Sequence, residues 1–141
     1  MPQPIREYSI NFDLTDRIRV YTTVDASPAL AAETVIATLN IGNFADIAVQ
    51  SGIRVSGWAA FTVGTSGTAV RFRIRQTNVS GTVVADTGAL TGGIAAGNLA
   101  AQDVEGFDAG AGVAAYALTM QVTAGAAAST VSKLVLQAVI I

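Results

Sequence analysis

The sequence predicts an all-β protein, a single antiparallel β-sandwich that is jelly-roll-like and has about eight strands. The main observation is a two-residue period, in which apolar residues alternate with polar or small ones as they do in half-buried strands. A second observation is that turn-forming pairs such as Ser66-Gly67, Ser80-Gly81 and Gly92-Gly93 separate these segments. A third is that segments with the 3.6-residue period of a helix are few. Short alternating strands at this spacing are typical of a sandwich or jelly roll.

Four of the expected strands lie in the first half of the chain. Arg17–Thr23 is one because Ile18 and Val20 alternate with polar residues. Ile53–Val63 is another because its apolar residues share one face, with Gly57 between them. Two further candidates are Ile5–Ile10 and Thr34–Ile41. Between them, Ser27–Glu33 could form one helical turn, with the serine as cap and a proline at the first helical position.

The other four expected strands lie in the second half. Thr68–Gln76 has the clearest pattern, because three apolar side chains face one way and three arginines face the other. Val113–Thr123 and Ser132–Ile140 alternate in the same manner, and Gly81–Asp86 is a further candidate. The glycine-rich segment Gly64–Thr68 lacks the lysine of a phosphate-binding loop and precedes a strand. It is therefore interpreted as a hairpin turn, and the Ala/Gly-rich run Leu90–Ala101 as a loop.

Length and charge distribution indicate one domain. A chain of 141 residues can bury enough surface to fold without a disulfide or a metal, and no linker divides it. Seven of the 18 charged residues fall in residues 1–25, so this segment is expected to be a charged N-terminal arm or an outer strand. The whole of residues 1–141 is otherwise assigned to a single sandwich domain.

The composition excludes most catalytic chemistry. The chain has no His and no Cys, so it cannot supply a Ser-His-Asp or Cys-His pair, nor the usual ligands of zinc, haem or an iron–sulfur cluster. We therefore expect no enzyme activity and no cofactor. One motif is an exception: Val83–Ala89 resembles the Asp-Thr-Gly-Ala motif of retroviral-type aspartic proteases, whose Asp shares a proton with a second Asp in a homodimer. The apolar-apolar-Gly motif that such enzymes carry late in the chain is missing, and a strand-ending turn at Asp86-Thr87-Gly88 is favoured.

Charge and hydropathy also limit the kinds of partner that the protein can have. The net charge is −2, which gives no general attraction to nucleic acid or to anionic lipid. The 24 uncharged residues between Asp108 and Lys133 are mostly small or polar, and their apolar residues alternate, so no membrane span is expected. The first ten residues contain no apolar stretch of the signal-peptide kind. Synthesis in the cytoplasm without a signal peptide is the expectation.

Four local features remain as candidate sites. Arg71, Arg73 and Arg75 form a stripe on one strand face, which is either solvated or in contact with an acidic protein surface; Phe72 points away, which disfavours nucleic acid. Trp58, the single Trp, should face away from Val55 and serve as an interface anchor, a cover on a buried strand or a sugar-stacking platform. The segment 103–108 holds Asp103, Glu105 and Asp108, interpreted as a solvated strand face rather than a Ca²⁺ site. The sequon Asn78-Val79-Ser80 is interpreted as a turn.

The chain resembles the small β-sandwich structural proteins of tailed-phage virions, which include capsid decoration (cement) proteins and fibre or appendage domains. The resemblance covers residues 32–141 and lies in Glu33–Leu39, Val55–Trp58, Gly64–Arg75, Ser80–Thr87, Tyr116–Thr123 and Ala128–Ser132. It implies a sandwich, often trimeric, that sits on a capsid lattice or a tail. It supplies no catalytic residues.

The function expected from the sequence is that of a non-enzymatic virion structural protein on the outer surface of a bacteriophage. The first choice is a homotrimeric decoration protein that binds the major capsid protein and stabilises the head. The alternatives are a tail-fibre or baseplate appendage domain, a carbohydrate-binding module that uses an exposed Trp58, and a dimeric protease that depends on Asp86. The candidate partner-contact residues are Arg71, Arg73, Arg75, Arg6, Glu7, Arg17, Arg19 and Trp58.

Overall fold

The computed structural model describes residues 18–21, 32–41, 52–66, 68–90, 94–109, 113–122 and 129–140. This part of the chain consists of strands and their connections, with no helix. It therefore also contains no helix long and apolar enough to cross a membrane. The strands are β1 (Ile18–Tyr21), β2 (Thr34–Asn40), β3 (Ile53–Thr62), β4 (Val70–Gln76), β5 (Val83–Asp86), β6 (Ala100–Asp108), β7 (Ala115–Val122) and β8 (Thr130–Ile140).

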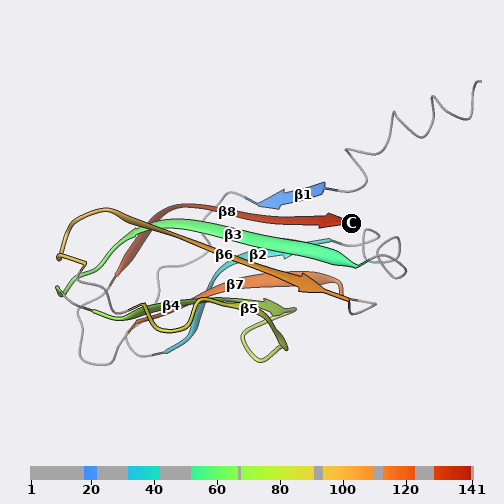
Figure 1. Cartoon of the computed structure of the whole chain (residues 1–141), viewed down its shortest axis with the longest axis horizontal. Coiled ribbons are helices and arrows are strands. Elements are labelled where there is room, and N and C mark those ends of the chain that lie inside the picture. The colour runs from blue at the N-terminus through green and yellow to red at the C-terminus, as the bar shows by residue number, and fades with distance from the viewer. Residues whose placement is uncertain are drawn as a thin grey trace, which may run out of the picture.

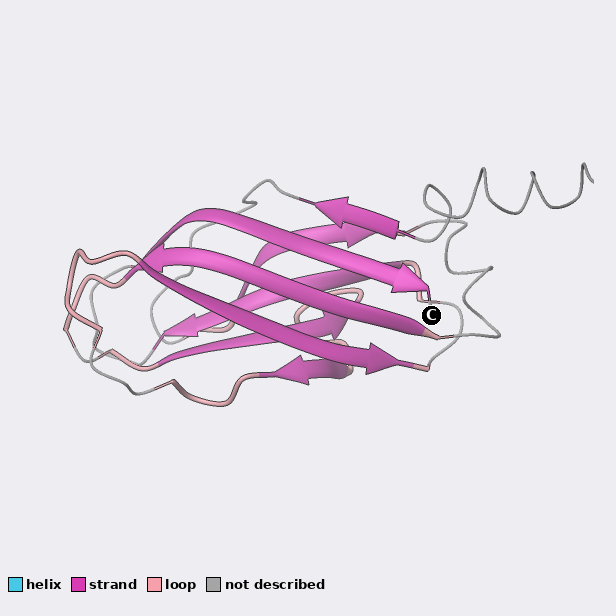
Figure 2. Ribbon diagram, turned by 45° about the horizontal axis from the view of Figure 1, so that its top comes forward, coloured by secondary structure: helices cyan, strands magenta, loops and turns pink. Residues whose placement is uncertain are grey.

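The strands form two four-stranded sheets that pack face to face (Figures 1 and 2). One sheet has the order β1-β8-β3-β6 and the other β2-β7-β4-β5. All neighbouring strands are antiparallel. Residues that alternate along each strand therefore face either the space between the sheets or the outside.

The pairing defines a jelly roll. β1 pairs with β8, β2 with β7, β3 with β6 and β4 with β5, which is the pattern of one long hairpin. When this hairpin rolls up, β3 also meets β8 and β4 also meets β7, and each sheet is completed. An eight-stranded double sheet of this kind is a jelly roll, so the predicted fold class is confirmed.

The strand predictions hold with small shifts at the ends, and one strand was missed. Of the eight expected strands, Ile5–Ile10 lies outside the described residues, as does nearly all of the helical turn expected at Ser27–Glu33. The missed strand is β6, although Asp103 and Glu105 had been assigned to a strand face. Its alternation is weak, because Val104 is its one strongly buried apolar residue. The loop expected at Leu90–Ala101 ends earlier than predicted, because β6 already begins at Ala100.

The hairpin interpretation of Gly64–Thr68 was wrong. A tight turn is present, since the backbone N–H and the hydroxyl of Thr68 both donate to the carbonyl oxygen of Thr65. However, β3 and β4 belong to different sheets, so this turn connects the two layers. β3 is already bonded to β6 on one side and to β8 on the other, which leaves no free edge for β4. Turn residues determine a local chain reversal but not which sheet the next strand joins.

The core lies between the sheets and is built from both. Its largest fully buried side chains include Tyr116, Phe61 and Phe72. The rings of Phe61 on β3 and Phe72 on β4 have centroids 5.3 Å apart and meet at a tilt, a favourable geometry for an aromatic pair. This contact joins an inner strand of one sheet to an inner strand of the other. The outer faces of the two sheets are left to carry the polar and charged side chains.

Candidate functional site

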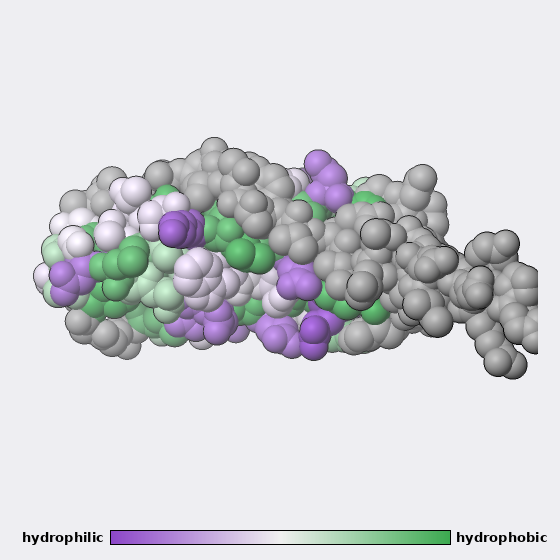
Figure 3. Space-filling model, turned by 90° about the horizontal axis from the view of Figure 1, so that it is seen from above, coloured by the Kyte–Doolittle hydropathy of each residue, from purple (hydrophilic) through white to green (hydrophobic). Residues whose placement is uncertain are grey.

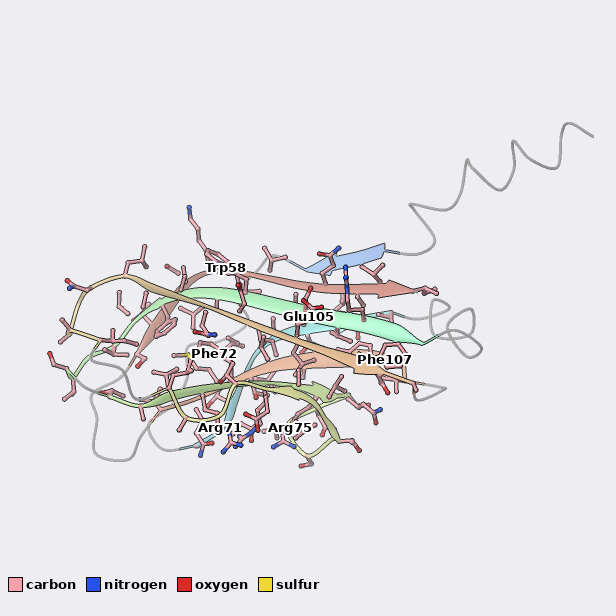
Figure 4. The ribbon with its side chains drawn as sticks, viewed as in Figure 1. Trp58, Arg71, Phe72, Arg75, Glu105 and Phe107 are labelled. Carbon is pink, nitrogen blue, oxygen red and sulfur yellow. The ribbon has the colours of Figure 1, made fainter. Side chains whose placement is uncertain are left out.

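The predicted site residues lie on opposite outer faces of the sandwich (Figure 4). Arg71 and Arg75 extend from the outer face of the β2-β7-β4-β5 sheet, whereas Trp58 lies on the outer face of the other sheet. Arg6, Glu7 and Arg17 lie outside the described residues. The backbone of Arg19 pairs with Ala138 of β8, but its side chain is outside the described part. Contacts through these four residues stay predictions.

The three arginines of β4 form a connected cluster with two carboxylates, here called the arginine cluster: Glu33, Arg71, Arg73, Arg75 and Asp86. Glu33 precedes β2 and accepts hydrogen bonds from Arg73 and Arg75. Nη1 of Arg73 donates to its Oε2 at 2.8 Å, while Nε and Nη2 of Arg75 donate to its Oε1 and Oε2 at 2.6 and 2.9 Å. The hydroxyl of Thr119 on β7 adds a further bond at 2.7 Å.

Asp86, at the end of β5, is the second carboxylate of the arginine cluster. Nε of Arg71 donates to its Oδ1 at 2.8 Å, and Nη2 of Arg71 donates to its Oδ2. Nε of Arg73 lies 3.3 Å from Oδ2, so Arg73 joins the two carboxylates. Arg73 also donates to the side-chain oxygen of Gln121 on β7. The cluster therefore ties together all four strands of its sheet.

The cluster keeps both carboxylates ionised. Hydrogen bonds from Arg71, with smaller contributions from the Gly88 N–H and Arg73, lower the pKa of Asp86 far below its ordinary value. For Glu33, burial raises the pKa, but the hydrogen bonds from Arg75 and Thr119 and the charges of both arginines outweigh it and lower the pKa. The pKa of Arg75 is raised in return, chiefly by its bond to Glu33. These groups are therefore a fixed ion-pair network near neutral pH.

The cluster is only partly available to a partner. The side chains of Arg73 and Arg75 are 11% and 18% exposed. Their donors are already engaged, by Glu33 in both cases and also by Asp86, Gln121 and the carbonyl oxygen of Gly81. Arg71 is 38% exposed and is the arginine that faces solvent most. With three cations and two anions, the cluster offers one excess positive charge. An acidic partner would thus meet mainly Arg71.

The Asp86-Thr87-Gly88 motif forms the predicted turn. Oδ1 of Asp86 accepts a hydrogen bond from the N–H of Gly88, and Gly88 adopts a left-handed conformation with φ 69°. The hydroxyl of Thr87 accepts from the N–H of Phe72. A catalytic aspartate of the paired type must share a proton, and the guanidinium groups of Arg71 and Arg73 oppose protonation of this one.

Two other sequence features also have structural roles. At Asn78-Val79-Ser80 the side-chain oxygen of Asn78 accepts from the Ser80 N–H, which confirms the predicted turn at the tip of the β4–β5 hairpin. On β6, Asp103 and Glu105 are exposed, whereas Asp108 has the opposite parity and is buried. The three carboxylates therefore do not share a face. Within the described ranges, no group of three or more acidic residues is placed to hold a metal ion.

Sequence reasoning missed a polar contact that joins the two sheets. The buried Asp108 accepts hydrogen bonds from the Tyr116 hydroxyl of β7 at 2.8 Å and from Nε2 of Gln76 of β4 at 3.0 Å. Burial, and then the bond to Asp108, raise the pKa of Tyr116. The signal was present in the parity of β6, since Asp108 falls on the same side as Val104. A carboxylate on an inward face requires a hydrogen-bonding partner.

The second candidate site is a hollow on the outer face of the β1-β8-β3-β6 sheet, here called the Trp58 hollow. It has a volume of about 250 Å³ and is lined by Ser56, Gly57, Trp58, Asp103, Val104, Glu105, Val135 and Gln137. Figure 3 looks onto this face, where hydrophobic and hydrophilic side chains are intermixed. Trp58 is 36% exposed, while Val55 and Phe61 are buried, so its predicted outward orientation is confirmed.

The register of β3 with its neighbours brings the hollow together. Trp58 lies opposite Asp103 of β6 and Val135 of β8. Ser56 lies opposite Glu105 and Gln137 in the same two strands. The association of Trp58 with two carboxylates was not predicted, because it depends on which strands flank β3 and in what register. No short-range sequence signal contains that information.

Comparison with solved structures shows a likeness in fold. In a crystal structure of a VP2 subviral particle of infectious bursal disease virus, 34% of the VP2 chain matches 89% of this chain with a TM-score of 0.59 and 16% identity. T=1 particles derived from the same virus give a TM-score of 0.60, 16% identity, and coverage of 89% of this chain and 32% of theirs. This chain thus spans about a third of the length of those proteins. The matches show that the fold occurs in the VP2 protein of virus particles.

One further structural match covers both chains almost fully. It is a pilus protein of Bacillus endospore appendages, with 89% of each chain covered and 21% identity, and its TM-score of 0.46 supports no inference about this chain. No family model matches the sequence, and no curated protein sequence matches it.

Proposed function

We propose that this protein is a non-enzymatic structural component of a virus particle. The observation that carries the proposal is the jelly-roll pairing of β1–β8, β2–β7, β3–β6 and β4–β5, together with the match to the VP2 particles. In finer terms, we propose a capsid decoration (cement) protein of a tailed phage. It would be made in the host cytoplasm and bind the outer surface of the head as a homotrimer, in contact with the major capsid protein.

The proposed mechanism is mechanical. A protein that binds the assembled capsid but not the separate subunits stabilises the assembly by mass action. A sandwich suits this task because its two sheets enclose the apolar core and their outer faces carry charged side chains such as Arg71, Asp103 and Glu105. The proposed contact residues are Arg71, Arg73, Arg75 and Trp58 on these faces, with Arg6, Glu7, Arg17 and Arg19 in the N-terminal segment. Of the three arginines in the cluster, Arg71 would contribute most.

A tail-fibre or baseplate appendage domain is the alternative within the same class. It shares the expectation of a trimer but differs in where the protein sits on the particle. A location on the tail would make the copies surround a narrow axis, whereas a location on the head would spread them over a lattice. The decoration role and the appendage role are therefore distinguished by where the protein lies on the particle rather than by its chemistry.

Immunogold labelling tests the proposal. An antibody raised against the purified full chain would be applied to particles isolated from cultures that produce this protein. We expect gold on intact heads; gold confined to tails would replace the decoration role by the appendage role. Absence of label on any particle, with the chain detected in the soluble fraction, would overturn the virion proposal. Light scattering after size exclusion measures the native mass, and a stable monomer would contradict the trimer.

A further inference from the structure

The Trp58 hollow has the shape of a receptor for one small group. Ser56, which has a short side chain, lines the hollow beside the larger Trp58 on the same strand. The volume of the hollow is about 250 Å³. This is below the usual range of pockets for drug-sized ligands. The hollow therefore fits the end of a side chain rather than a large cofactor.

The charged side chains that line the hollow in the described part of the chain are both carboxylates. The carboxylate of Asp103 has no hydrogen-bond or ion-pair partner in the described part of the chain. Oε1 of Glu105 lies 3.9 Å from Nε of Arg54, and both side chains are more than half exposed. An exposed pair at this separation contributes little. Two carboxylates thus line the hollow, and the ion pair they make within the described residues is the long Arg54–Glu105 contact.

The indole ring of Trp58 is a second group in the hollow that attracts a cation. Trp58 and Asp103 are direct cross-strand neighbours, a relation that places their side chains within contact range. The face of an indole attracts a cation, more strongly than the rings of Phe or Tyr do. A positively charged group in the hollow would meet this ring together with the carboxylates of Asp103 and Glu105. Figure 4 shows Trp58 and Glu105 away from Arg71 and Arg75, which lie on the opposite side of the sandwich.

We propose that the Trp58 hollow binds an arginine or lysine side chain of a neighbouring protein subunit in the particle. The partner's role as a virion subunit rests on the proposed function, whereas the affinity for a basic side chain follows from the hollow itself. Charge complementarity selects this occupant. A neutral sugar would also stack on Trp58, but it would leave the negative charge of Asp103 and Glu105 uncompensated.

Fluorescence titration of the full chain with N-acetyl-arginine amide tests the proposal. Trp58 is the single Trp of the chain, so the emission change reports on this site alone. We expect a saturable change that weakens when the ionic strength rises from about 0.01 M to about 1 M, which shortens the Debye length from about 30 Å to about 3 Å. N-acetyl-citrulline amide has nearly the same shape without the charge and serves as the matched control ligand.

Variants of the chain sharpen the test. Asp103→Asn with Glu105→Gln should weaken arginine binding at least about fivefold, because both anions are lost. Arg54→Gln should leave binding equal or tighter, since it removes a competing cation. All three side chains are exposed, and circular dichroism with a thermal melt would verify that each variant is folded.

Each remaining outcome of the titration would overturn the proposal. These outcomes are equal binding of the citrulline and arginine compounds, no binding of either, and a response to methyl glycosides instead, which would assign the hollow to saccharides. None of these results bears on immunogold labelling of particles, so the virion role is tested separately. Conversely, arginine binding by a protein that labels no particle would leave the hollow intact and remove the capsid as its partner.

Discussion

At the scale of single residues, the arginine cluster shows how a charged stripe can belong to the fold. The alternation along β4 places three arginines on one face, and a stripe of like charges repels itself unless anions lie between them. Glu33 and Asp86 supply those anions from segments before β2 and at the end of β5. Because Arg73 and Arg75 are largely buried, their pairing with Glu33 contributes more than an exposed pair would.

Glu33→Gln is expected to lower the free energy of unfolding by about 1–3 kcal/mol near neutral pH, the usual cost of leaving charged hydrogen-bonding groups without a partner. The substitution keeps the shape of the side chain but removes the charge between Arg73 and Arg75. Urea denaturation followed by circular dichroism measures the difference. Glu105→Gln is the matched control, because its ion pair with Arg54 is long and exposed, and it should change stability by less than about 0.5 kcal/mol.

The free energy of unfolding of Glu33→Gln should depend less on acid pH than that of the parent chain. The folded-state pKa of Glu33 is below its ordinary value of 4.5, so its contribution is present above pH 4.5 and is lost as the pH falls toward the folded-state pKa. The parent chain should therefore lose stability below about pH 4.5, and Glu33→Gln should lose less over the same interval. Parallel curves for the two proteins would contradict the assigned role of Glu33.

At the scale of elements, β6 depends on a close approach to the opposite sheet. A Cβ atom at Gly106 would lie 2.4 Å from the carbonyl oxygen of Val84 and 2.9 Å from Cβ of Ala85 on β5. Gly106 thus lets the edge of one sheet come down onto the edge of the other. At Gly57 on β3, the nearest atoms are side-chain carbons of Leu118 and Val104 at 3.1 and 3.2 Å, which can shift.

Gly106→Ala is expected to destabilise the protein by about 1–3 kcal/mol, since the added methyl group collides with backbone and forces the strands apart. Gly57→Ala should cost clearly less, because flexible side chains can yield and alanine suits a strand better than glycine does. Thermal and urea unfolding of the two variants give the comparison. An equal or greater cost for Gly57→Ala would show that the separation of β5 and β6 is not set by Gly106.

At the scale of the whole molecule, the jelly roll makes the two halves of the chain interdependent. Every strand pair in the described part joins one of β1–β4 to one of β5–β8. Each sheet contains two strands from each half. The Asp108–Tyr116 and Asp108–Gln76 bonds then connect the two sheets. Such a fold is rich in contacts between distant parts of the sequence and should form slowly, in milliseconds to seconds.

We expect the chain cut between Ser80 and Gly81 to give two fragments that are each unfolded alone. Residues 1–80 contain β1–β4 and residues 81–141 contain β5–β8, and neither set can form any of the native strand pairs of the described structure. Far-ultraviolet circular dichroism and proton–nitrogen correlation spectra would reveal this, with the intact chain for comparison. A fragment that unfolds cooperatively on its own would be incompatible with the rolled-hairpin topology.

The sequence by itself determined most of the strands apart from β6, the face on which most side chains lie and the exclusion of His- and Cys-based chemistry. These properties are local: alternation places Trp58 and Arg71 outward and Phe72 inward whatever the neighbouring strands are. The turns at Asn78-Val79-Ser80 and Asp86-Thr87-Gly88 were predictable for the same reason, because their side chains bond to backbone one or two residues away.

Only the tertiary structure decided which strands are neighbours, and both candidate sites depend on that. Glu33 meets Arg75 across 42 positions of sequence, and Trp58 meets Asp103 across 45 by strand register. The turn at Gly64–Thr68 was misassigned to a hairpin, and the buried Asp108–Tyr116 bond was missed, for the same cause. Pairing between distant strands results from the packing of the whole core, since the sheet that a strand joins is selected by which edges remain free and which apolar faces can be buried together.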